Sequence, residues 1–284
     1  MTNAVVFFLF GQSNAVGHGI PMKEEDKIIT PLKNVFGLSR EKNQSFDIDK
    51  LTWSGYKSAG MNLGETQDDT YSIANCLAQK WQNAIDEGKN LPDLYIVQIA
   101  IGAQGVTKEY LWYPYLEKKL VPGPLGIADI SLHPLAKHIM SLIPESMKKM
   151  DKNPRYLMHW RGGENDYLVS KEELKKVLCP IYDKLFSDWE EAVGEEITMY
   201  LHRLICEDAP RCYDNYSEIM ESYYYINSVF EKYAEKSNIS VFDSRNCPDY
   251  SKDKEHFGVF LEDDVHFTPE VNKWIADEII KGQV

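Results

Sequence analysis

Five short apolar runs, rich in β-branched and aromatic residues, are spaced along the chain. Runs of this length and composition are typical of buried β-strands. They are Val5 to Phe10, Leu94 to Ile101, Arg155 to Trp160, Ile197 to Leu204 and Ile239 to Phe242. We therefore predict a strand at each of these positions.

Amphipathic helical patterns separate the apolar runs. Between Tyr71 and Ile85, apolar residues such as Ile73, Leu77 and Trp81 recur every four positions, which places them on one face of a helix. Further helices are predicted at Pro134 to Lys149, Lys171 to Val193, Ser217 to Lys236 and Pro269 to Ile280. Thr268 and Pro269 suit the N-cap and the first position of the last helix.

This alternation of strands and helices predicts a three-layer α/β/α sandwich around a central, mostly parallel sheet. Two long stretches, Gly17 to Thr66 and Val106 to Leu132, show no period and are expected to be irregular. With no repeat and no linker, residues 1–284 are expected to form a single domain. Ligands of such sheets bind at the carboxyl ends of the strands, so the residues after each apolar run are site candidates.

Composition and charge narrow the function. Hydrophobic residues make up 43% and charged residues 26% of the chain, as in globular proteins. The net charge of -13 argues against a nucleic-acid partner, which would require clustered Lys and Arg. No apolar run approaches the roughly 18 residues of a membrane span.

The cysteines and the N-terminus give no sign of secretion. The five cysteines include no CxxC pair and no zinc-ligand spacing, so we expect neither a disulfide framework nor a metal site, although Cys206 and Cys212 are close enough in sequence to be bridged. The apolar N-terminal run lacks a basic region and a cleavage site. We expect a cytoplasmic protein, a phage protein or a trimmed secreted chain.

Ser13 follows the first predicted strand in the segment Gly11-Gln12-Ser13-Asn14. If a helix begins here, its free N–H groups favour developing negative charge beside the hydroxyl. This placement suits a nucleophile, but it also suits a simple N-cap.

Asp263 stands three residues before His266, immediately before the last predicted helix. A carboxylate beside a neutral imidazole fixes its tautomer and makes it a general base, as a serine nucleophile requires. We take Asp263 as the orienting carboxylate and expect Asp264 to face water. An exposed acidic turn with an incidental histidine is the alternative.

Two glycine-containing segments complete the candidate site. The run Gly162-Gly163-Glu164-Asn165-Asp166 follows the third strand, and the Asn165 amide can donate to an oxyanion. Gly64, within Asn62 to Glu65, allows its backbone N–H to approach a ligand closely. Either segment alone could be an ordinary turn.

The order of these blocks, GQSN, a glycine before the first long helix, GEND and DDVH, resembles the SGNH hydrolase superfamily, whose fold is flavodoxin-like. The GQSN form resembles the branch with sialate O-acetylesterases and acetylxylan esterases of carbohydrate esterase family 6. The blocks run from Gly11 to His266, nearly the whole chain.

The resemblance implies a role for each matching residue. Ser13 would be the nucleophile, His266 its base and Asp263 the orienter, while the N–H groups of Ser13 and Gly64 and the Asn165 amide would form the oxyanion hole. Gln12 and Glu164 match positions that support the site, and no cofactor is implied.

The chain departs from the family pattern at two points. Arg161-Gly162 stands where the branch has glutamine, and Arg161 could supply a cation for an acidic sugar. Gly60 could replace Gly64 as the oxyanion donor.

The implied activity is hydrolysis of O-acetyl esters on carbohydrates, so the expected partner is an acetylated carbohydrate. The aromatic stretches Trp53 to Tyr56 and Tyr110 to Tyr115 could stack on sugars or could pack loops onto the domain. A lipase or thioesterase of the same superfamily, and a carbohydrate-binding or phage adhesion module without turnover, are the alternatives.

Overall fold

The computed structural model describes residues 2–39, 51–64, 69–116, 131–205 and 216–283. Its strands are β1 (Ala4–Gly11), β2 (Val35–Leu38), β3 (Trp53–Gly55), β4 (Asp93–Ala100), β5 (Pro154–Arg161), β6 (Ile197–His202) and β7 (Ile239–Phe242). Its α-helices are α1 (Ser13–Val16), α2 (Ile73–Asp86), α3 (Leu132–Lys149), α4 (Lys171–Val193), α5 (Tyr216–Tyr233) and α6 (Pro269–Lys281). The 3-10 helices are η1 (Glu24–Asp26), η2 (Glu164–Leu168), η3 (Ser244–Asn246) and η4 (Glu255–Gly258).

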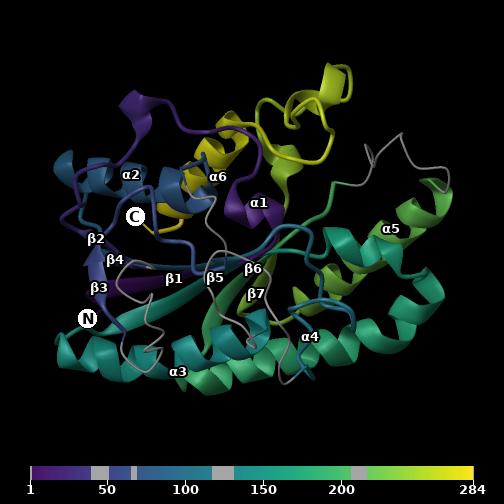
Figure 1. Ribbon diagram of the computed structural model, residues 1–284, viewed down its shortest axis with the longest axis horizontal. Coiled ribbons are helices and arrows are strands. Elements are labelled where there is room, and N and C mark those ends of the chain that lie inside the picture. Colours follow the sequence, from purple (N-terminus) through teal and green to yellow (C-terminus); the bar gives the residue numbers. More distant parts are fainter. Residues whose placement is uncertain (1, 40–50, 65–68, 117–130, 206–215, 284) are drawn as a thin grey trace.

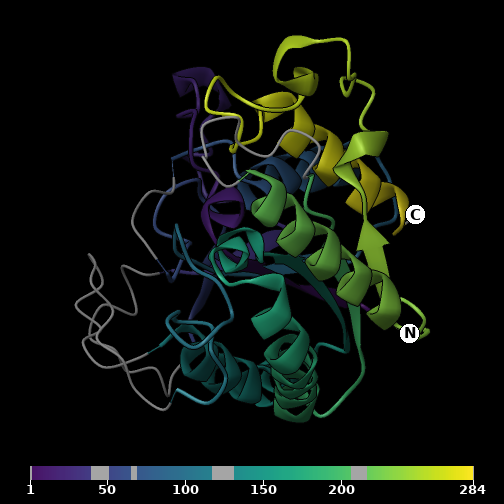
Figure 2. The same ribbon diagram turned by 90° about the vertical axis from the view of Figure 1, so that its right-hand side faces the viewer.

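The strands form one sheet in the order β3-β2-β4-β1-β5-β6-β7, in which only β3 pairs antiparallel. Helices α2 and α6 cover one face, and α3, α4 and α5 cover the other (Figures 1 and 2). The predicted three-layer sandwich with a mostly parallel sheet is therefore confirmed. The single-domain expectation stays a prediction.

All eight residues of β1 are buried, and its side chains alternate between two cores. Phe8 and Phe10 pack towards α3 and α4, whereas Phe7 and Leu9 pack towards α2 and α6. This pattern follows from the two-residue period of a strand that is covered on both faces.

The register of β1 brings three loops to one edge of the sheet. Gly11 at the end of β1 lies opposite Ala100 at the end of β4 and Arg161 at the end of β5. The GQSN segment, the loop after Ala100 and the GGEND segment therefore leave the sheet side by side.

The expectation of an irregular stretch from Gly17 to Thr66 was wrong, because this stretch supplies β2 and β3. These strands are short, and each contains a glycine, Gly37 or Gly55, that interrupts the apolar run by which a strand is recognised in the sequence. The described part of Val106 to Leu132 lies outside strands and contributes only the start of α3. Cys206 and Cys212 lie outside the described residues.

Three buried histidines make stability depend on pH. His159 and His202 contact each other through Nδ1 and Nε2 at 2.8 Å, and burial lowers the pKa of His159 to about 3 and that of His202 well below its usual value. Burial also lowers the pKa of His133 to about 4, despite the carboxylate of Asp188 at 3.2 Å. All three are neutral in the folded protein at neutral pH.

We predict that the free energy of unfolding decreases as the pH falls from about 6.5 towards 4. Below about pH 6.5 the unfolded chain binds protons at these histidines and the folded protein does not. Each histidine therefore lowers the free energy of unfolding by up to about 1.4 kcal/mol for each pH unit of acidification. Urea unfolding at several pH values measures this slope.

The variant His133→Gln, which cannot be protonated, should show a smaller slope than the wild type. Asp166, whose pKa burial raises to about 6, acts in the opposite direction in both proteins and so does not affect the comparison. Equal slopes would mean that His133 binds its proton as readily in the folded protein as in the unfolded chain.

Candidate active site

Ser13 lies on a sharp turn at the end of β1. Gly11 has φ of 147°, and a Cβ atom there would lie 1.8 Å from the carbonyl oxygen of Arg161. Only glycine fits this approach. The N–H of Gln12 donates to the same carbonyl at 3.0 Å, and Trp112 Nε1 donates to the carbonyl of Gly11 at 2.9 Å. The turn that presents Ser13 is thus fixed from β5 and from the loop after β4.

Ser13 is the first residue of α1, and Gln12 occupies the N-cap position. The N-cap alternative for Ser13 is therefore wrong. Within the described part of the chain, the N–H of Ser13 has no protein acceptor. Because α1 has only four residues, this N–H group itself, rather than a helix dipole, is what the turn offers to a negative charge.

His266 and Asp263 form the expected pair. His266 Nδ1 lies 2.6 Å from Asp263 Oδ2, and Asp263 Oδ1 accepts the N–H groups of Val265 and His266 at 3.0 and 2.9 Å. Burial raises the pKa of Asp263, but these hydrogen bonds from His266 and Val265 outweigh it and leave the pKa below its usual value. The carboxylate is therefore ionised, and a proton on Nδ1 of His266 directed at it would leave Nε2 as the acceptor that a general base requires.

Asp264 does not face water as expected. Its carboxylate contacts Nδ1 of His256, and its side chain is 26% exposed against 47% for Asp263. Asp264 has φ of 57°, which turns consecutive carboxylates in different directions. The two aspartates thus serve two different histidines.

Asn14 joins the turn that carries Ser13 to the loop that carries His266, a role that the sequence analysis did not assign. Its amide nitrogen donates to the carbonyl of Val265 at 3.1 Å, and its amide oxygen accepts the N–H of Phe267 at 3.1 Å. The residue after Ser13 therefore binds the residues on both sides of His266. The motif did contain a signal, since Asn14 is the last letter of GQSN.

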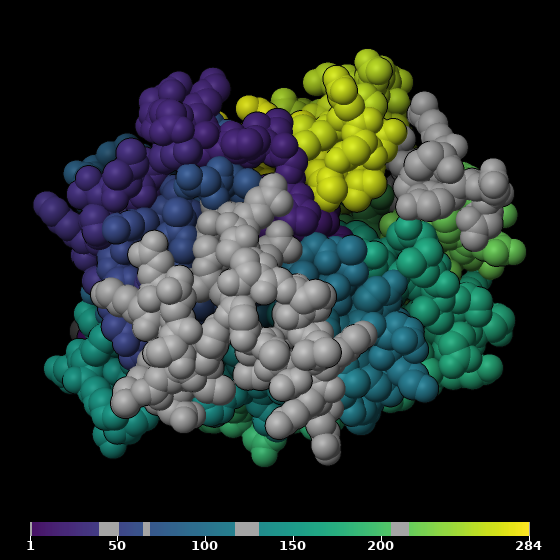
Figure 3. All heavy atoms as spheres, viewed as in Figure 1, coloured from purple at the N-terminus to yellow at the C-terminus, as the bar shows by residue number. Residues whose placement is uncertain are grey.

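Contacts around α1 also bring the two ends of the chain together. The rings of His18 and His266 have centroids 5.7 Å apart, and N-terminal and C-terminal atoms adjoin on the face shown in Figure 3. Ser13 and His266 make no hydrogen bond with each other in the described structure. Catalytic hydrogen bonds commonly tighten only when substrate is bound.

The GGEND segment contacts the same turn through Glu164. Its Oε1 accepts the amide nitrogen of Asn14 at 3.4 Å and Nη1 of Arg161 at 2.9 Å. Asn165 follows in η2 and is only half-buried. Its carbonyl accepts the hydroxyl of Tyr110 at 3.1 Å, which fixes the backbone that carries the amide side chain.

Asp166 is a second residue that the sequence analysis missed. Its buried carboxylate accepts the N–H groups of Val106 and Thr107 and the hydroxyl of Thr107, all at 2.9 to 3.1 Å. Burial raises the pKa of Asp166 to about 6, although these hydrogen bonds favour the charged form. Asp166 thus holds the loop after β4 against the loop after β5.

Gly64 lies against the end of β4, where a Cβ atom would be 2.1 Å from the carbonyl oxygen of Ala100. Its N–H donates to Oδ1 of Asn62 at 2.9 Å, so an oxyanion would have to share or displace this bond. Gly60, the alternative donor, has φ of 80°. The choice between these two donors stays a prediction.

Arg161 is buried, with its side chain 3% exposed. Its guanidinium pairs with Glu164 and lies 4.3 Å from the ring centroid of Phe267, the residue after His266. Burial lowers its pKa, and the charge of Glu164 opposes this. This geometry favours a positioning role for Arg161 over contact with a sugar.

In the described residues, no group of three or more His, Cys, Asp or Glu side chains is arranged to hold a metal ion. None of the described helices is long and apolar enough to cross a membrane.

Comparison with known proteins identifies shared folds. No family model and no curated protein matches the sequence. An Arabidopsis thaliana protein aligns over 100% of both chains at 15% identity and a TM-score of 0.56. NanS aligns over 99% of this chain and 97% of its own at 14% identity and a TM-score of 0.58. A carbohydrate acetylesterase from Xanthomonas citri aligns over 98% of this chain and 57% of its own at 10% identity and a TM-score of 0.47. At these identities the likeness concerns the fold.

We predict that Asn14→Ala lowers kcat more than it raises KM. Loss of both hydrogen bonds frees the backbone on either side of His266, and misplacing a base by about 1 Å costs up to about 100-fold in rate. Steady-state kinetics on p-nitrophenyl acetate measures the effect.

The matched control is Asn272→Ala, because Asn272 is equally buried in α6 and its amide donates to the carbonyl of Tyr71 at 2.8 Å. Each substitution should destabilise by about 1 to 3 kcal/mol, but only Asn14→Ala should reduce kcat. Equal kcat values in the two variants would remove Asn14 from the positioning of His266.

Proposed function

We propose that the protein is a serine esterase that hydrolyses O-acetyl or other short-acyl esters on carbohydrates through an acyl-enzyme. The observation that supports this best is the double hydrogen bond of Asn14 to Val265 and Phe267. It holds a carboxylate-oriented histidine beside the residue that follows Ser13, and this supports the proposal because acyl transfer by a serine requires a base and an orienter near the nucleophile.

The first step forms the acyl-enzyme. Nε2 of His266 removes the hydroxyl proton as Oγ of Ser13 attacks the ester carbonyl carbon, and the carbonyl oxygen becomes an oxyanion. The N–H of Ser13, the amide of Asn165 and the N–H of Gly64 stabilise this charge, and one such donor contributes about 3 kcal/mol. The bond from the acyl carbon to the sugar oxygen then breaks, and His266 returns the proton to the leaving alcohol.

The second step releases the acid. His266 removes a proton from water, the hydroxyl oxygen adds to the acyl carbon, and the bond to Oγ of Ser13 breaks as the serine regains its proton. Asp263 remains ionised and stabilises the imidazolium in both steps. Gln12 and Glu164 support the site by holding the turn and the Asn14 amide.

The carbohydrate part of the proposal comes from the motif resemblance and names the substrate class to be tested. Acetate release from acetylated xylan, O-acetylated sialic acid and O-acetylated bacterial polysaccharides, followed by mass spectrometry, tests activity and substrate together. A preference for p-nitrophenyl octanoate over the acetate would instead support a lipase. Binding of these carbohydrates without hydrolysis would support an adhesion module.

We predict that Ser13→Ala and His266→Ala each lower kcat for p-nitrophenyl acetate by at least about 10⁴-fold. The loss of kcat in Asp263→Asn should be about 10- to 100-fold smaller than the loss in Ser13→Ala, because an orienter contributes less than the groups it orients. Circular dichroism and thermal unfolding verify that each variant is folded. Substantial turnover by folded Ser13→Ala would remove Ser13 from the mechanism.

A further inference from the structure

A pocket of about 490 Å³ lies between the loop after β4 and the start of α4. We call it the tyrosine pocket; its lining includes Tyr110, Tyr113, Tyr115, Leu168, Val177 and Pro180. Its volume lies within the range of roughly 300 to 1,000 Å³ that is usual for small-molecule sites. None of the proposed catalytic residues lines it, so it is a separate feature of the same edge of the sheet.

The wall of the tyrosine pocket is tied to the proposed catalytic centre at three points. Tyr110 donates to the carbonyl of Asn165, Thr107 binds the carboxylate of Asp166, and Trp112 from the same loop donates to the carbonyl of Gly11. The nucleophile turn and the oxyanion amide are therefore held by the loop that forms the pocket.

The lining combines rings with polar groups. Tyr113 and Tyr115 meet edge to face with ring centroids 5.3 Å apart. Tyr115 is 52% exposed and Leu168 is 65% exposed, so both side chains present apolar surface to solvent. Four charged residues also contribute to the lining: Lys108, Glu109, Glu173 and Lys176.

This combination favours a sugar over an acyl chain. A pyranose ring has a flat face of C–H groups that packs on an aromatic ring and a rim of hydroxyls that requires hydrogen-bond partners. The tyrosine rings and the charged groups match these two features. An acyl chain would take these charged groups out of water without offering them a hydrogen bond, and would gain nothing from the tyrosine hydroxyls.

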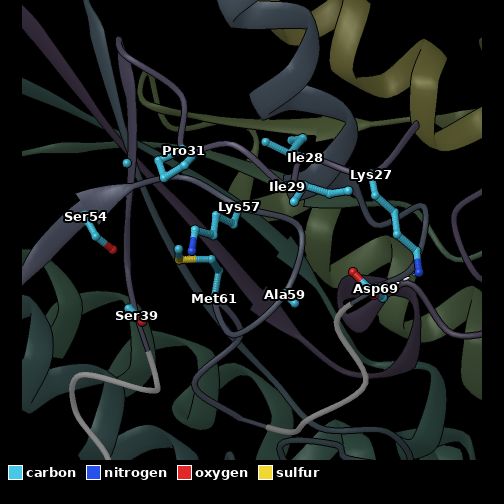
Figure 4. Close-up of a pocket in the computed structure, with 11 residues that line it drawn as sticks. Lys27, Ile28, Ile29, Pro31, Ser39, Ser54, Lys57, Ala59, Met61 and Asp69 are labelled. Atoms are coloured by element: carbon cyan, nitrogen blue, oxygen red, sulfur yellow. Dashed lines mark ion pairs between the residues drawn. The ribbon is translucent and has the colours of Figure 1, made fainter. Parts of the chain in front are cut away.

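A second cavity, of about 520 Å³, lies beside β3 and is lined by residues that include Lys27, Lys57, Met61 and Asp69 (Figure 4). Lys27 forms ion pairs with Asp69 at 3.2 Å and with Glu24 at 2.7 Å. Its described lining contains no aromatic ring, and so it offers no surface on which a sugar could stack.

We propose that the tyrosine pocket binds a sugar ring next to the acylated one, so that the protein acts on oligosaccharide or polysaccharide esters in preference to acetylated monosaccharides. The inference rests on the proposed esterase function. Tyr115 provides an exposed stacking ring, and Leu168 contacts the same ring of the sugar from the other wall.

The test uses three O-acetylated trisaccharides: a xylose trimer, a glucose trimer and sialyllactose. Each is compared with the acetylated monosaccharide that carries the same ester (xylose, glucose or sialic acid) and with p-nitrophenyl acetate. We expect the wild type to have a higher kcat/KM for at least one trisaccharide than for its monosaccharide. In Tyr115→Ala, KM for that trisaccharide should rise roughly 3- to 10-fold, as expected for loss of one stacking ring. Kinetics on p-nitrophenyl acetate should stay within about twofold.

Two further variants separate the pocket from general effects. Tyr115→Phe retains the ring and should preserve most of the trisaccharide preference. Tyr224→Ala removes a tyrosine of α5 that is 50% exposed and does not line the pocket, and it should change neither substrate.

The outcomes distinguish this inference from the proposed function. Hydrolysis of p-nitrophenyl acetate without preference for any trisaccharide, or with equal losses in Tyr115→Ala for all substrates, would overturn the sugar site and leave the esterase standing. A selective loss of p-nitrophenyl octanoate hydrolysis in Tyr115→Ala would identify an acyl pocket instead. Hydrolysis of no ester by the wild type would overturn both.

Discussion

Strand β1 is covered by helices on both faces and is paired with β4 and β5 on its two edges. The positions of the candidate catalytic groups depend on this double burial of β1. Fully burying each of Phe7, Phe8, Leu9 and Phe10 stabilises by about 1.5 to 3 kcal/mol. Because its side chains alternate between two packed cores, a shift of one residue would expose the wrong set to each core. The register with β4 and β5 is thereby fixed, and with it the common edge at which three functional loops leave the sheet.

Hydrogen bonds of buried polar groups at that edge of the sheet fix the loops relative to one another. Asn14 binds the histidine loop and Glu164, while Asp166 binds the loop that carries Tyr110 and Trp112. A buried amide or carboxylate costs free energy unless it is hydrogen-bonded. The loops therefore have little freedom to separate without leaving these groups unpaired.

The sequence analysis predicted the layers, five of the described strands and the longer helices, because these strands are uninterrupted apolar runs and these helices show a period. It did not predict β2 and β3, because each is short and contains a glycine that interrupts the apolar run. The pairing of His266 with Asp263 was predicted from their spacing of three positions, and the structure places His266 Nδ1 2.6 Å from Asp263 Oδ2.

Contacts between distant parts of the chain could not be predicted in this way. Asn14 and Val265 are separated by 251 positions and Asp166 and Val106 by 60, and no local pattern links them. The prediction that Asp264 faces water was wrong for a related reason. Its contact with His256 and its positive φ arise from the fold of the loop, which the spacing of residues does not describe.

The departure from the family pattern at Arg161-Gly162 is compatible with an intact site. A Cβ atom at Gly162 would lie 2.8 Å from the ring of Trp160, so the backbone here approaches that ring too closely for a larger residue. Arg161 contributes a cation instead, which pairs with Glu164 and stacks on Phe267. Removing only one partner of a buried pair costs about 3 to 5 kcal/mol, whereas the intact pair links the GGEND turn to the residue after His266. The pair of Arg161 and Glu164 thus supports the histidine loop from the end of β5.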